Sequence, residues 1–320
     1  MKIVILDSYT AVSTDLSFDC LKEITSDITS YDRTQPQDVV KRIGNADAIL
    51  INKTQITKEV LEQCPNLKYI GIFATGYNMV DLVYCKGHNI VVSNVPGYST
   101  NAVAQLTFSF ILNFTFLIDK HNKEVHEGKW IENDTFCYYD PRITELYGKT
   151  LGVVGFGNIA KQVARIASAF DMNVVVYSRT KYPEYENENL HFVDMDTLLQ
   201  KSDIITLHVP LFKETEKLIN RDAIAKMKQS AILINTARGG IIDEQAVADA
   251  LNCNKLAGAG LDVTTVEPIL KTNPLLTAKN CVITPHIAWS CREARARLIG
   301  VVCDNIKAFQ KGEPQNNVAK

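Results

Sequence analysis

The sequence predicts an α/β protein built from two doubly wound parallel sheets. Short apolar, β-branched runs alternate with longer segments of helical periodicity along the whole chain. The runs are continuously apolar, which favours parallel strands covered by helices on both faces. A chain of 320 residues with 46% hydrophobic residues can form two such domains. The expected strands are residues 3–6, 48–51, 69–73, 90–92, 151–154, 174–177, 204–207, 231–234, 257–261 and 282–283.

The two domains are expected to be interleaved rather than consecutive. A turn-forming stretch at residues 96–99 separates the first four strands from a long helix that starts near Asn101. After the last strand, Ser290 and Glu293 have the spacing of a capping box, which would open a final helix. We therefore expect a substrate domain formed by residues 1–98 and 290–320, with a cofactor domain of residues 99–289 inserted into it.

Composition and charge argue against several classes of protein. The 34 Lys and Arg residues nearly balance the 36 Asp and Glu residues, so no strong field favours nucleic acid or anionic membranes as partners. The longest apolar stretch, residues 108–118, is shorter than the roughly 20 residues of a membrane span. The eight cysteines show no paired spacing and no secretory signal is visible, so we expect reduced thiols, no metal site and a cytoplasmic location.

A glycine-rich turn follows the expected strand at residues 151–154. It reads Gly-Phe-Gly-Asn-Ile-Ala at positions 155–160, the pattern that places a dinucleotide pyrophosphate at a helix N-terminus. Gly155 allows the tight turn, Gly157 lets the backbone approach the pyrophosphate, and Ala160 lets the helix pack on the strand. The residues expected to hold the pyrophosphate are Gly155, Gly157, Asn158 and Ile159.

The next strand is followed by Ser178, Arg179 and Thr180, which we expect to contact the adenosine ribose of the cofactor. An NAD site usually has Asp or Glu here to bind the ribose 2′-hydroxyl, and this chain has neither. Arg179 suits a 2′-phosphate, because a guanidinium binds phosphate oxygens through paired hydrogen bonds. We therefore expect NADPH or NADH as the cofactor, with NADPH preferred. The alternative is that Arg179 is a solvated loop residue.

Three further segments occur in a characteristic order. They read Asn-Thr-Ala-Arg-Gly-Gly at 235–240, Gly-Leu-Asp-Val at 260–263 followed by Glu267-Pro268, and Thr-Pro-His-Ile-Ala-Trp at 284–289. With these motifs the chain resembles the D-isomer-specific 2-hydroxyacid dehydrogenases over nearly its whole length. The segments that resemble the glycerate dehydrogenase (hydroxypyruvate reductase) branch in particular are 74–78, 96–101 and 286–289. The resemblance implies two Rossmann-like domains.

Arg238, Glu267 and His286 each follow an expected strand, where parallel sheets bind ligands, and they match the catalytic trio of this family position by position. Arg238 suits the carboxylate of a 2-oxo acid, because its planar guanidinium binds two oxygens in fixed geometry. His286 suits proton donation near neutral pH, and Glu267 would orient the imidazole and favour its protonated form. Taken singly, each of the three could have an ordinary structural role.

The resemblance also implies contacts outside the trio. Thr75 and Gly76 follow the expected strand at 69–73, where a glycine leaves backbone N–H groups open to an anion, and they would bind the substrate together with Arg238 and His286. Asp262 would contact the nicotinamide carboxamide or its ribose. The other residues implied to line the cofactor pocket are Val209, Pro210, Thr236, Ala237, Arg238 and His286.

The helix expected from Asn101 is apolar on more than one face, which implies burial all round. In the family this region forms a two-fold dimer interface, so a homodimer is expected, although burial inside the monomer would also explain the pattern. The aromatic loop at residues 130–139 is a candidate for contact with the neighbour's active site.

The function implied is the reduction of hydroxypyruvate or glyoxylate to D-glycerate or glycolate, by hydride transfer from NAD(P)H. A different 2-oxo acid is one alternative, because specificity depends on side chains that the sequence does not place in three dimensions. A non-catalytic dinucleotide-sensing protein is another. The presence of Arg238, Glu267 and His286 together argues against it.

Overall fold

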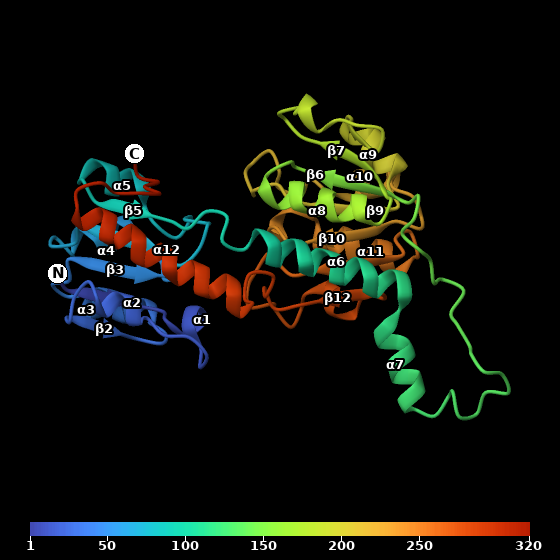
Figure 1. The fold of residues 1–320 in the computed structure, drawn as a ribbon, viewed down its shortest axis with the longest axis horizontal. Coiled ribbons are helices and arrows are strands. Elements are labelled where there is room, and N and C mark those ends of the chain that lie inside the picture. Colours follow the sequence, from blue (N-terminus) through green and yellow to red (C-terminus); the bar gives the residue numbers. More distant parts are fainter. The chain divides into compact units, whose positions relative to one another are not determined.

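The computed structural model describes residues 1–320 and divides them into two compact units. The first unit comprises Met1–Ser99 and Trp289–Lys320, and the second comprises Thr100–Ala288 (Figure 1). The chain therefore leaves the first unit and returns to it one residue away from the crossings expected from the sequence. Each unit is an α/β structure with a wholly parallel sheet, which confirms the predicted fold class.

The first unit has a five-stranded sheet in the order β2-β1-β3-β4-β5. Its strands are β1 (Ile3–Ile5), β2 (Ile28–Ser30), β3 (Ala48–Ile51), β4 (Tyr69–Ile72) and β5 (Val91–Ser93). Its N-terminal segment also forms α1 (Tyr9–Val12), α2 (Asp19–Lys22), η1 (Pro36–Asp38), α3 (Val39–Ile43), α4 (Lys58–Glu62) and α5 (Leu82–Gly87). Every residue of β1, β3 and β4 is buried, as expected for strands covered on both faces.

Helix α12 (Arg292–Gln310) completes the first unit from the far end of the sequence. It packs across the sheet, where the Phe309 ring lies 4.8 Å from the Tyr69 ring and the Asn305 Nδ2 donates to the Asn94 carbonyl at 3.0 Å. The predicted capping box at Ser290 is wrong. The N-cap is Cys291, which makes no side-chain cap hydrogen bond, so helix α12 starts one residue later than the box requires.

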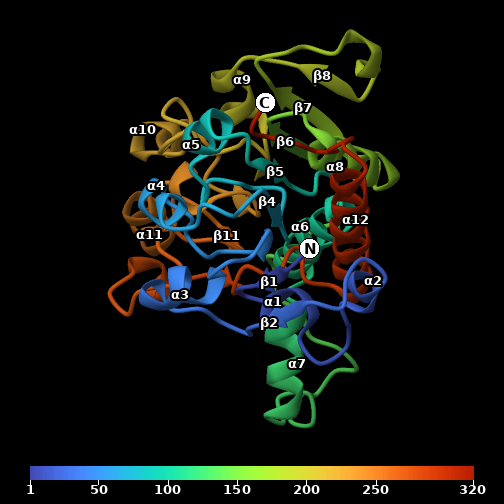
Figure 2. The same ribbon diagram turned by 90° about the vertical axis from the view of Figure 1, so that its left-hand side faces the viewer.

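A disulfide joins Cys20 of α2 to Cys303 of α12, two helices that lie side by side in the first unit (Figure 2). This contradicts the expectation that all thiols are reduced. The two cysteines are 283 residues apart, so no local spacing marks the pair. Cys64 and Cys85 remain free and buried, and burial raises the pKa of the Cys85 thiol to about 12.

The second unit has a seven-stranded sheet in the order β12-β11-β10-β9-β6-β7-β8. Its strands are β6 (Thr150–Val154), β7 (Asn173–Tyr177), β8 (Leu190–Phe192), β9 (Ile204–Leu207), β10 (Ile232–Asn235), β11 (Gly258–Leu261) and β12 (Cys281–Ile283). The helical segments are α6 (Thr100–Phe116), α7 (Ile118–His126), α8 (Asn158–Ala169), η2 (Pro183–Tyr185), α9 (Met195–Lys201), α10 (Arg221–Lys226), η3 (Gly239–Ile241), α11 (Glu244–Asn252) and η4 (Pro274–Thr277).

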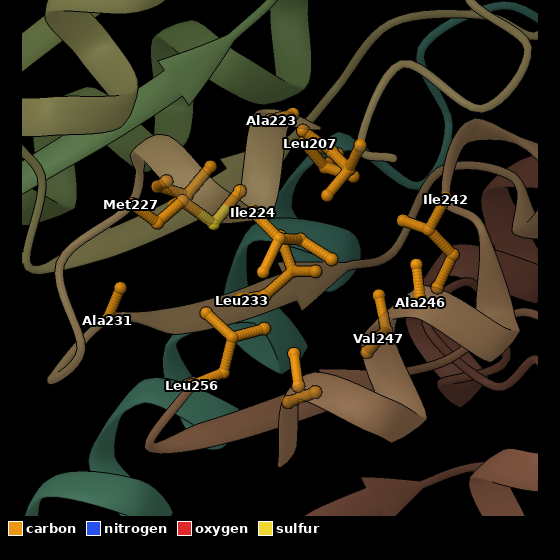
Figure 3. Packing of buried hydrophobic residues seen from close by; sticks show 14 of the residues in the cluster. Leu207, Ala223, Ile224, Met227, Ala231, Leu233, Ile242, Ala246, Val247 and Leu256 are labelled. Carbon is orange, nitrogen blue, oxygen red and sulfur yellow. The ribbon is translucent and has the colours of Figure 1, made fainter. Parts of the chain in front are cut away.

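Two apolar clusters, one on each face of this sheet, fix the layers of the second unit. Helices α6 and α8 contribute to the cluster that contains Phe110, Val163 and Val153. Helices α9, α10 and α11 contribute to the other, in which Ile224 and Val247 surround Leu233 of β10 (Figure 3). The strand order reverses between β6 and β9, and in such sheets ligands bind beyond the carboxyl ends of the strands.

Helix α6 is largely buried within its own unit. The Phe110 ring lies so close to Gly260 that a Cβ there would stand 2.7 Å from it, and Phe114 meets Gly258 in the same way. No single helix is long and apolar enough to cross a membrane. Helices α6 and α7 taken together have the length and composition of a membrane span, but the pair is bent by 57° at the break between them. Exposed apolar side chains lie instead at the end of α6, on α7 and on the loop that follows: Phe116, Ile118, Val125, Trp130, Ile131, Phe136, Tyr139 and Tyr147.

Candidate active site

His286 stands in a tight turn just after β12. Its backbone has a φ of +55°, and its N–H donates to the carbonyl oxygens of Asp262 at 2.8 Å and of Thr284 at 2.9 Å. The ring Nδ1 lies 2.7 Å from Oε2 of Glu267, with 26% of the His286 side chain exposed. This pairing fixes the ring from one side and leaves Nε2 as the nitrogen that can meet a substrate.

Asp262 anchors the turn that carries His286. It follows β11, is 1% exposed, and accepts hydrogen bonds from Thr284 Oγ1 at 2.6 Å and from the N–H groups of Ile287 and Ala288, both at 2.8 Å. Burial raises the pKa of the Asp262 carboxyl above its usual value, against the lowering effect of these hydrogen bonds. The family resemblance implies that Asp262 contacts the cofactor. In the structure its carboxylate accepts the hydrogen bonds that hold the His286 turn.

Arg238 follows β10 and is exposed. Asn235, which is fully buried, shapes the turn: its Nδ2 donates to the Arg238 carbonyl at 2.9 Å and its Oδ1 accepts from the Ala237 N–H at 3.0 Å. The Arg238 Nη1 donates to the Ala237 carbonyl at 2.7 Å. The remaining guanidinium donors can therefore bind a carboxylate.

The turn of Arg238 and the loop of Glu267 lie directly against each other. A Cβ on Gly239 would stand 1.9 Å from the Thr264 carbonyl carbon, so only glycine fits. Thr264 in turn donates its N–H to Oε1 of Glu267 at 3.3 Å. Because β10, β11 and β12 are neighbours in the sheet, the structure brings Arg238, Glu267 and His286 to one edge.

The glycine-rich turn between β6 and α8 has the geometry of a pyrophosphate site. Gly155 has a φ of +90°, and a Cβ on it would stand 2.8 Å from the His208 carbonyl oxygen and from Val209. No atom lies within 4 Å of the position of a Cβ on Gly157, the N-cap of α8, so the backbone there is open to a ligand. Asn158 and Ile159 form the first turn of this helix.

The other expected cofactor residues lie at the carboxyl ends of neighbouring strands. Ser178 is half-buried at the end of β7, and Arg179 and Thr180 beside it are exposed. Thr236 is buried with its hydroxyl 3.2 Å from that of Thr107. Strand β9 is followed directly by His208, Val209 and Pro210. Burial lowers the pKa of His208 to about 3, and its Nε2 lies 2.9 Å from the Thr206 hydroxyl.

Thr75 and Gly76 lie in the first unit, in the loop after β4, and the structure does not place that unit relative to the trio. The Thr75 hydroxyl donates to the Val95 carbonyl at 2.7 Å, and the Thr75 carbonyl accepts from Asn94 Nδ2 at 2.7 Å. These bonds tie the loop to the residues that follow β5. Its role in substrate binding stays a prediction.

The sequence missed several residues that shape these loops. In the first unit, Asp7 follows β1 and accepts from the N–H groups of Asn52 and Lys53 at 2.6 Å and of Thr54 at 2.9 Å. In the second unit, Asn235 and Gly239 are part of the motif around Arg238, and their packing roles were not recognised. Glu244, the first residue of α11, accepts the Thr265 N–H at 2.6 Å in the loop of Glu267. It gives no signal in the sequence, because an acid in the first turn of a helix is ordinary.

Known proteins resemble the chain over its full length. A model of the family "D-isomer specific 2-hydroxyacid dehydrogenase, NAD binding domain" matches residues 108–288. The chain is 46% identical over 323 residues to a hydroxypyruvate reductase of Blautia hydrogenotrophica, and the match covers 100% of both.

Two solved structures show the same similarity. An acyclic imino acid reductase in complex with NADPH and D-arginine superposes with a TM-score of 0.87 and 32% identity, covering 99% of this chain and 100% of that one. A D-lactate dehydrogenase from Aquifex aeolicus, complexed with NAD and lactic acid, gives a TM-score of 0.82 and 30% identity over 98% of this chain and 96% of the other.

Proposed function

The chain belongs to the D-isomer-specific 2-hydroxyacid dehydrogenases, an NAD(P)-dependent family, and from this premise we propose that it reduces hydroxypyruvate or glyoxylate to D-glycerate or glycolate. The proposal rests on one observation. The Nδ1 of His286 lies 2.7 Å from Oε2 of Glu267, at the carboxyl ends of the same neighbouring strands that carry Arg238. The similarity to a hydroxypyruvate reductase over the whole chain supports the choice of substrate.

The cofactor residues fit a dinucleotide. The positive φ of Gly155, the open backbone at Gly157 and the N-terminus of α8 suit a pyrophosphate. When bound, the nicotinamide cofactor supplies the hydride. Gly155, Gly157, Asn158 and Ile159 would hold its pyrophosphate, and Ser178, Arg179 and Thr180 its adenosine ribose.

The residues of the trio divide the remaining work. Arg238 binds the substrate carboxylate and orients the carbonyl, because its outer guanidinium donors are exposed. His286 holds a proton on Nε2 and donates it to the carbonyl oxygen as that oxygen gains charge. Glu267 accepts the proton of Nδ1, which fixes the ring orientation and leaves Nε2 facing the substrate.

A panel of 2-oxo acids, assayed with NADPH and with NADH, tests the proposal. Hydroxypyruvate or glyoxylate should give the highest kcat/KM. The change His286→Ala should lower kcat by about 10²–10⁴-fold, the usual contribution of a positioned acid. Preference for another 2-oxo acid would overturn the substrate assignment, and dinucleotide binding without any turnover would favour a sensing protein.

The preference for NADPH is a second part of the proposal. No carboxylate follows β7, and Arg179 is exposed next to Ser178 and Thr180. We expect a higher kcat/KM with NADPH than with NADH, and we expect Arg179→Ala to lower only the value for NADPH. Lys201→Ala, on the exposed end of α9, is the control and should change neither value. A wild-type preference for NADH would reject this part.

A homodimer is the third part, and the exposed apolar residues of α7 and its loop support it. Ile131 and Phe136 are 88% and 89% exposed, and a concentration of exposed apolar side chains in one segment is typical of an interaction site. Light scattering should give twice the mass of 35.7 kDa, and the double change Ile131→Asp, Phe136→Asp should give the monomer. A monomeric wild-type protein would exclude the dimer.

A further inference from the structure

Glu244, the first residue of α11, connects this helix to the loop that carries Glu267. One of its carboxylate oxygens, Oε1, accepts the Thr265 N–H at 2.6 Å. The other, Oε2, accepts from Nδ2 of Asn273 at 2.9 Å. Glu267 lies between Thr265 and Asn273 in the sequence, so a single carboxylate holds both ends of its loop.

The contacts continue without a gap from Glu244 to His286. Thr265 adjoins Thr264, whose N–H donates to Oε1 of Glu267 at 3.3 Å and whose hydroxyl donates to the Val266 carbonyl at 2.9 Å. The second oxygen of Glu267 is the one that lies 2.7 Å from the His286 ring. A shift of the loop at Thr265 therefore moves the carboxylate that orients the imidazole.

The far end of the loop is fixed through the same side chain. Asn273 donates to Glu244 with its Nδ2, and its Oδ1 caps η4 by accepting the Leu275 N–H at 3.0 Å. Leu275 is 1% exposed and belongs to the apolar cluster of α11. Asn273 thus links Glu244 to η4, whose Leu275 is buried in the core, and the loop is held at both ends.

The negative charge of Glu244 is favourable at the N-terminus of α11. It stands in the first turn of α11, where the N-cap Asp243 accepts the Ala246 N–H at 3.1 Å, and a negative side chain is favourable at that end of a helix. The bond to Thr265 joins an ionised acceptor to a backbone N–H, which makes it stronger than a neutral hydrogen bond.

We propose that Glu244 is a positioning residue of the active site, which holds Glu267 against His286 by fixing the loop 264–273. This inference rests on the proposed function, because it assigns Glu244 to the same proton transfer. Glu244 itself touches neither substrate nor cofactor and acts only through Glu267.

Turnover and its pH dependence give the first test. Glu244→Ala should lower kcat for the reduction, by up to about 10²-fold, since a misplacement of about 1 Å can cost that much. The KM values for cofactor and 2-oxo acid should change little. Because the ring loses its carboxylate, the pH profile of reduction should come to resemble that of Glu267→Gln. Glu244→Gln should have an intermediate kcat, since its amide oxygen still accepts the Thr265 N–H but its NH₂ group faces the Asn273 donor.

A matched control separates this effect from general damage to α11. Gln245→Ala removes the next side chain of the helix, which is exposed and bonds only to Asp249 at 2.8 Å, and it should leave kcat and the pH profile unchanged. The double change Glu244→Ala, Glu267→Gln should be no slower than Glu267→Gln alone. Fully additive losses would overturn the proposal, because Glu244 would then act independently of Glu267.

A spectroscopic test does not require turnover. A histidine Nδ1–H held by a carboxylate gives a proton resonance at unusually low field. It should be seen in the wild type, vanish in Glu267→Gln, weaken or vanish in Glu244→Ala, and persist in Gln245→Ala. Glu244→Asp keeps the charge but moves both carboxylate oxygens away from the loop. This variant replaces Glu244→Ala if the Ala variant does not fold, and it should also weaken the resonance. An unchanged resonance in folded Glu244→Ala or Glu244→Asp would refute the positioning role. A wild-type protein that reduces no 2-oxo acid would reject the proposed function and leave this test intact.

Discussion

Gly239 lies against the backbone of Thr264 so closely that no side chain can be placed between them. This contact joins the turn that carries Arg238 to the loop that carries Glu267, which come from two neighbouring strands. The distance between the substrate-binding guanidinium and the carboxylate that orients His286 thus depends on a residue without a side chain.

Gly239→Ala should therefore separate the two segments. A new Cβ would stand 1.9 Å from the Thr264 carbonyl carbon, and the backbone on one side must move. We expect overpacking to cost about 1–3 kcal/mol in the free energy of unfolding. We also expect kcat/KM to fall by at least about 10²-fold. Gly240→Ala is the control: its Cβ would meet only the tip of the Leu211 side chain, at 3.0 Å, and should be tolerated. Equal effects of the two changes would argue against this account.

The pH dependence of the two directions should have opposite signs. Reduction needs a protonated imidazole at His286 and should fade as the pH rises, whereas oxidation needs the neutral ring and should fade as the pH falls. His208 cannot cause either change near neutrality, because burial lowers its pKa to about 3. His208→Gln should keep both profiles, whereas Glu267→Gln should alter both, because it replaces the carboxylate that contacts the His286 ring. Parallel profiles in the two directions would contradict the scheme.

Asp262→Ala should damage both stability and turnover. It removes the acceptor of the Ile287 and Ala288 N–H groups, and each buried group left unpaired costs about 1–3 kcal/mol. Urea unfolding measures this loss, and kcat reports the displaced His286 turn. Asp262→Asn keeps one acceptor oxygen and should be less unstable, but its amide N–H₂ faces a backbone donor. A kcat of Asp262→Asn equal to the wild type would show that the carboxylate is not needed to place His286.

Asp140 should make the loop after α7 sensitive to acid. Arg142, through its side chain and backbone, and Lys120 hold the pKa of this carboxyl well below its usual range. A depressed pKa means that the stabilisation is present above the unfolded pKa of about 3.9 and is lost as the pH falls toward the folded value. The protection factors of residues 118–147, which are the intrinsic exchange rates divided by the observed rates, should therefore fall in acid. In Asp140→Asn the protection factors should be low already at pH 7, with a weaker dependence on acid. The same profile in both proteins would exclude Asp140 as the cause.

The sequence predicts the buried parts of the fold better than its edges. The apolar strands β3, β4, β9 and β10 are continuous buried runs, and Arg238 follows the carboxyl end of β10. β2 and β8 were missed because each is three residues long, lies at a sheet edge and is only partly buried. The start of α12 was misplaced because the spacing of Ser290 and Glu293 says nothing of backbone geometry at Cys291.

The trio was found because its members stand in recognisable motifs after strands. The residues that hold it could not be found in this way, because their partners are distant in sequence. Asp262 meets residues 22 to 26 positions away, and Glu244 meets residues 21 and 29 positions away. The disulfide is the extreme case, because its two cysteines are 283 positions apart.

The insertion of one unit into the other sets an order for folding during synthesis. Domains fold as units while the chain emerges from the ribosome. Thr100–Ala288 is complete before α12 has been made, whereas the sheet of the first unit waits for Phe309 to cover Tyr69. The nascent first unit, begun earliest, thus carries an uncovered apolar sheet face until Phe309 has been made. In that interval it is the part of the chain most in need of a chaperone.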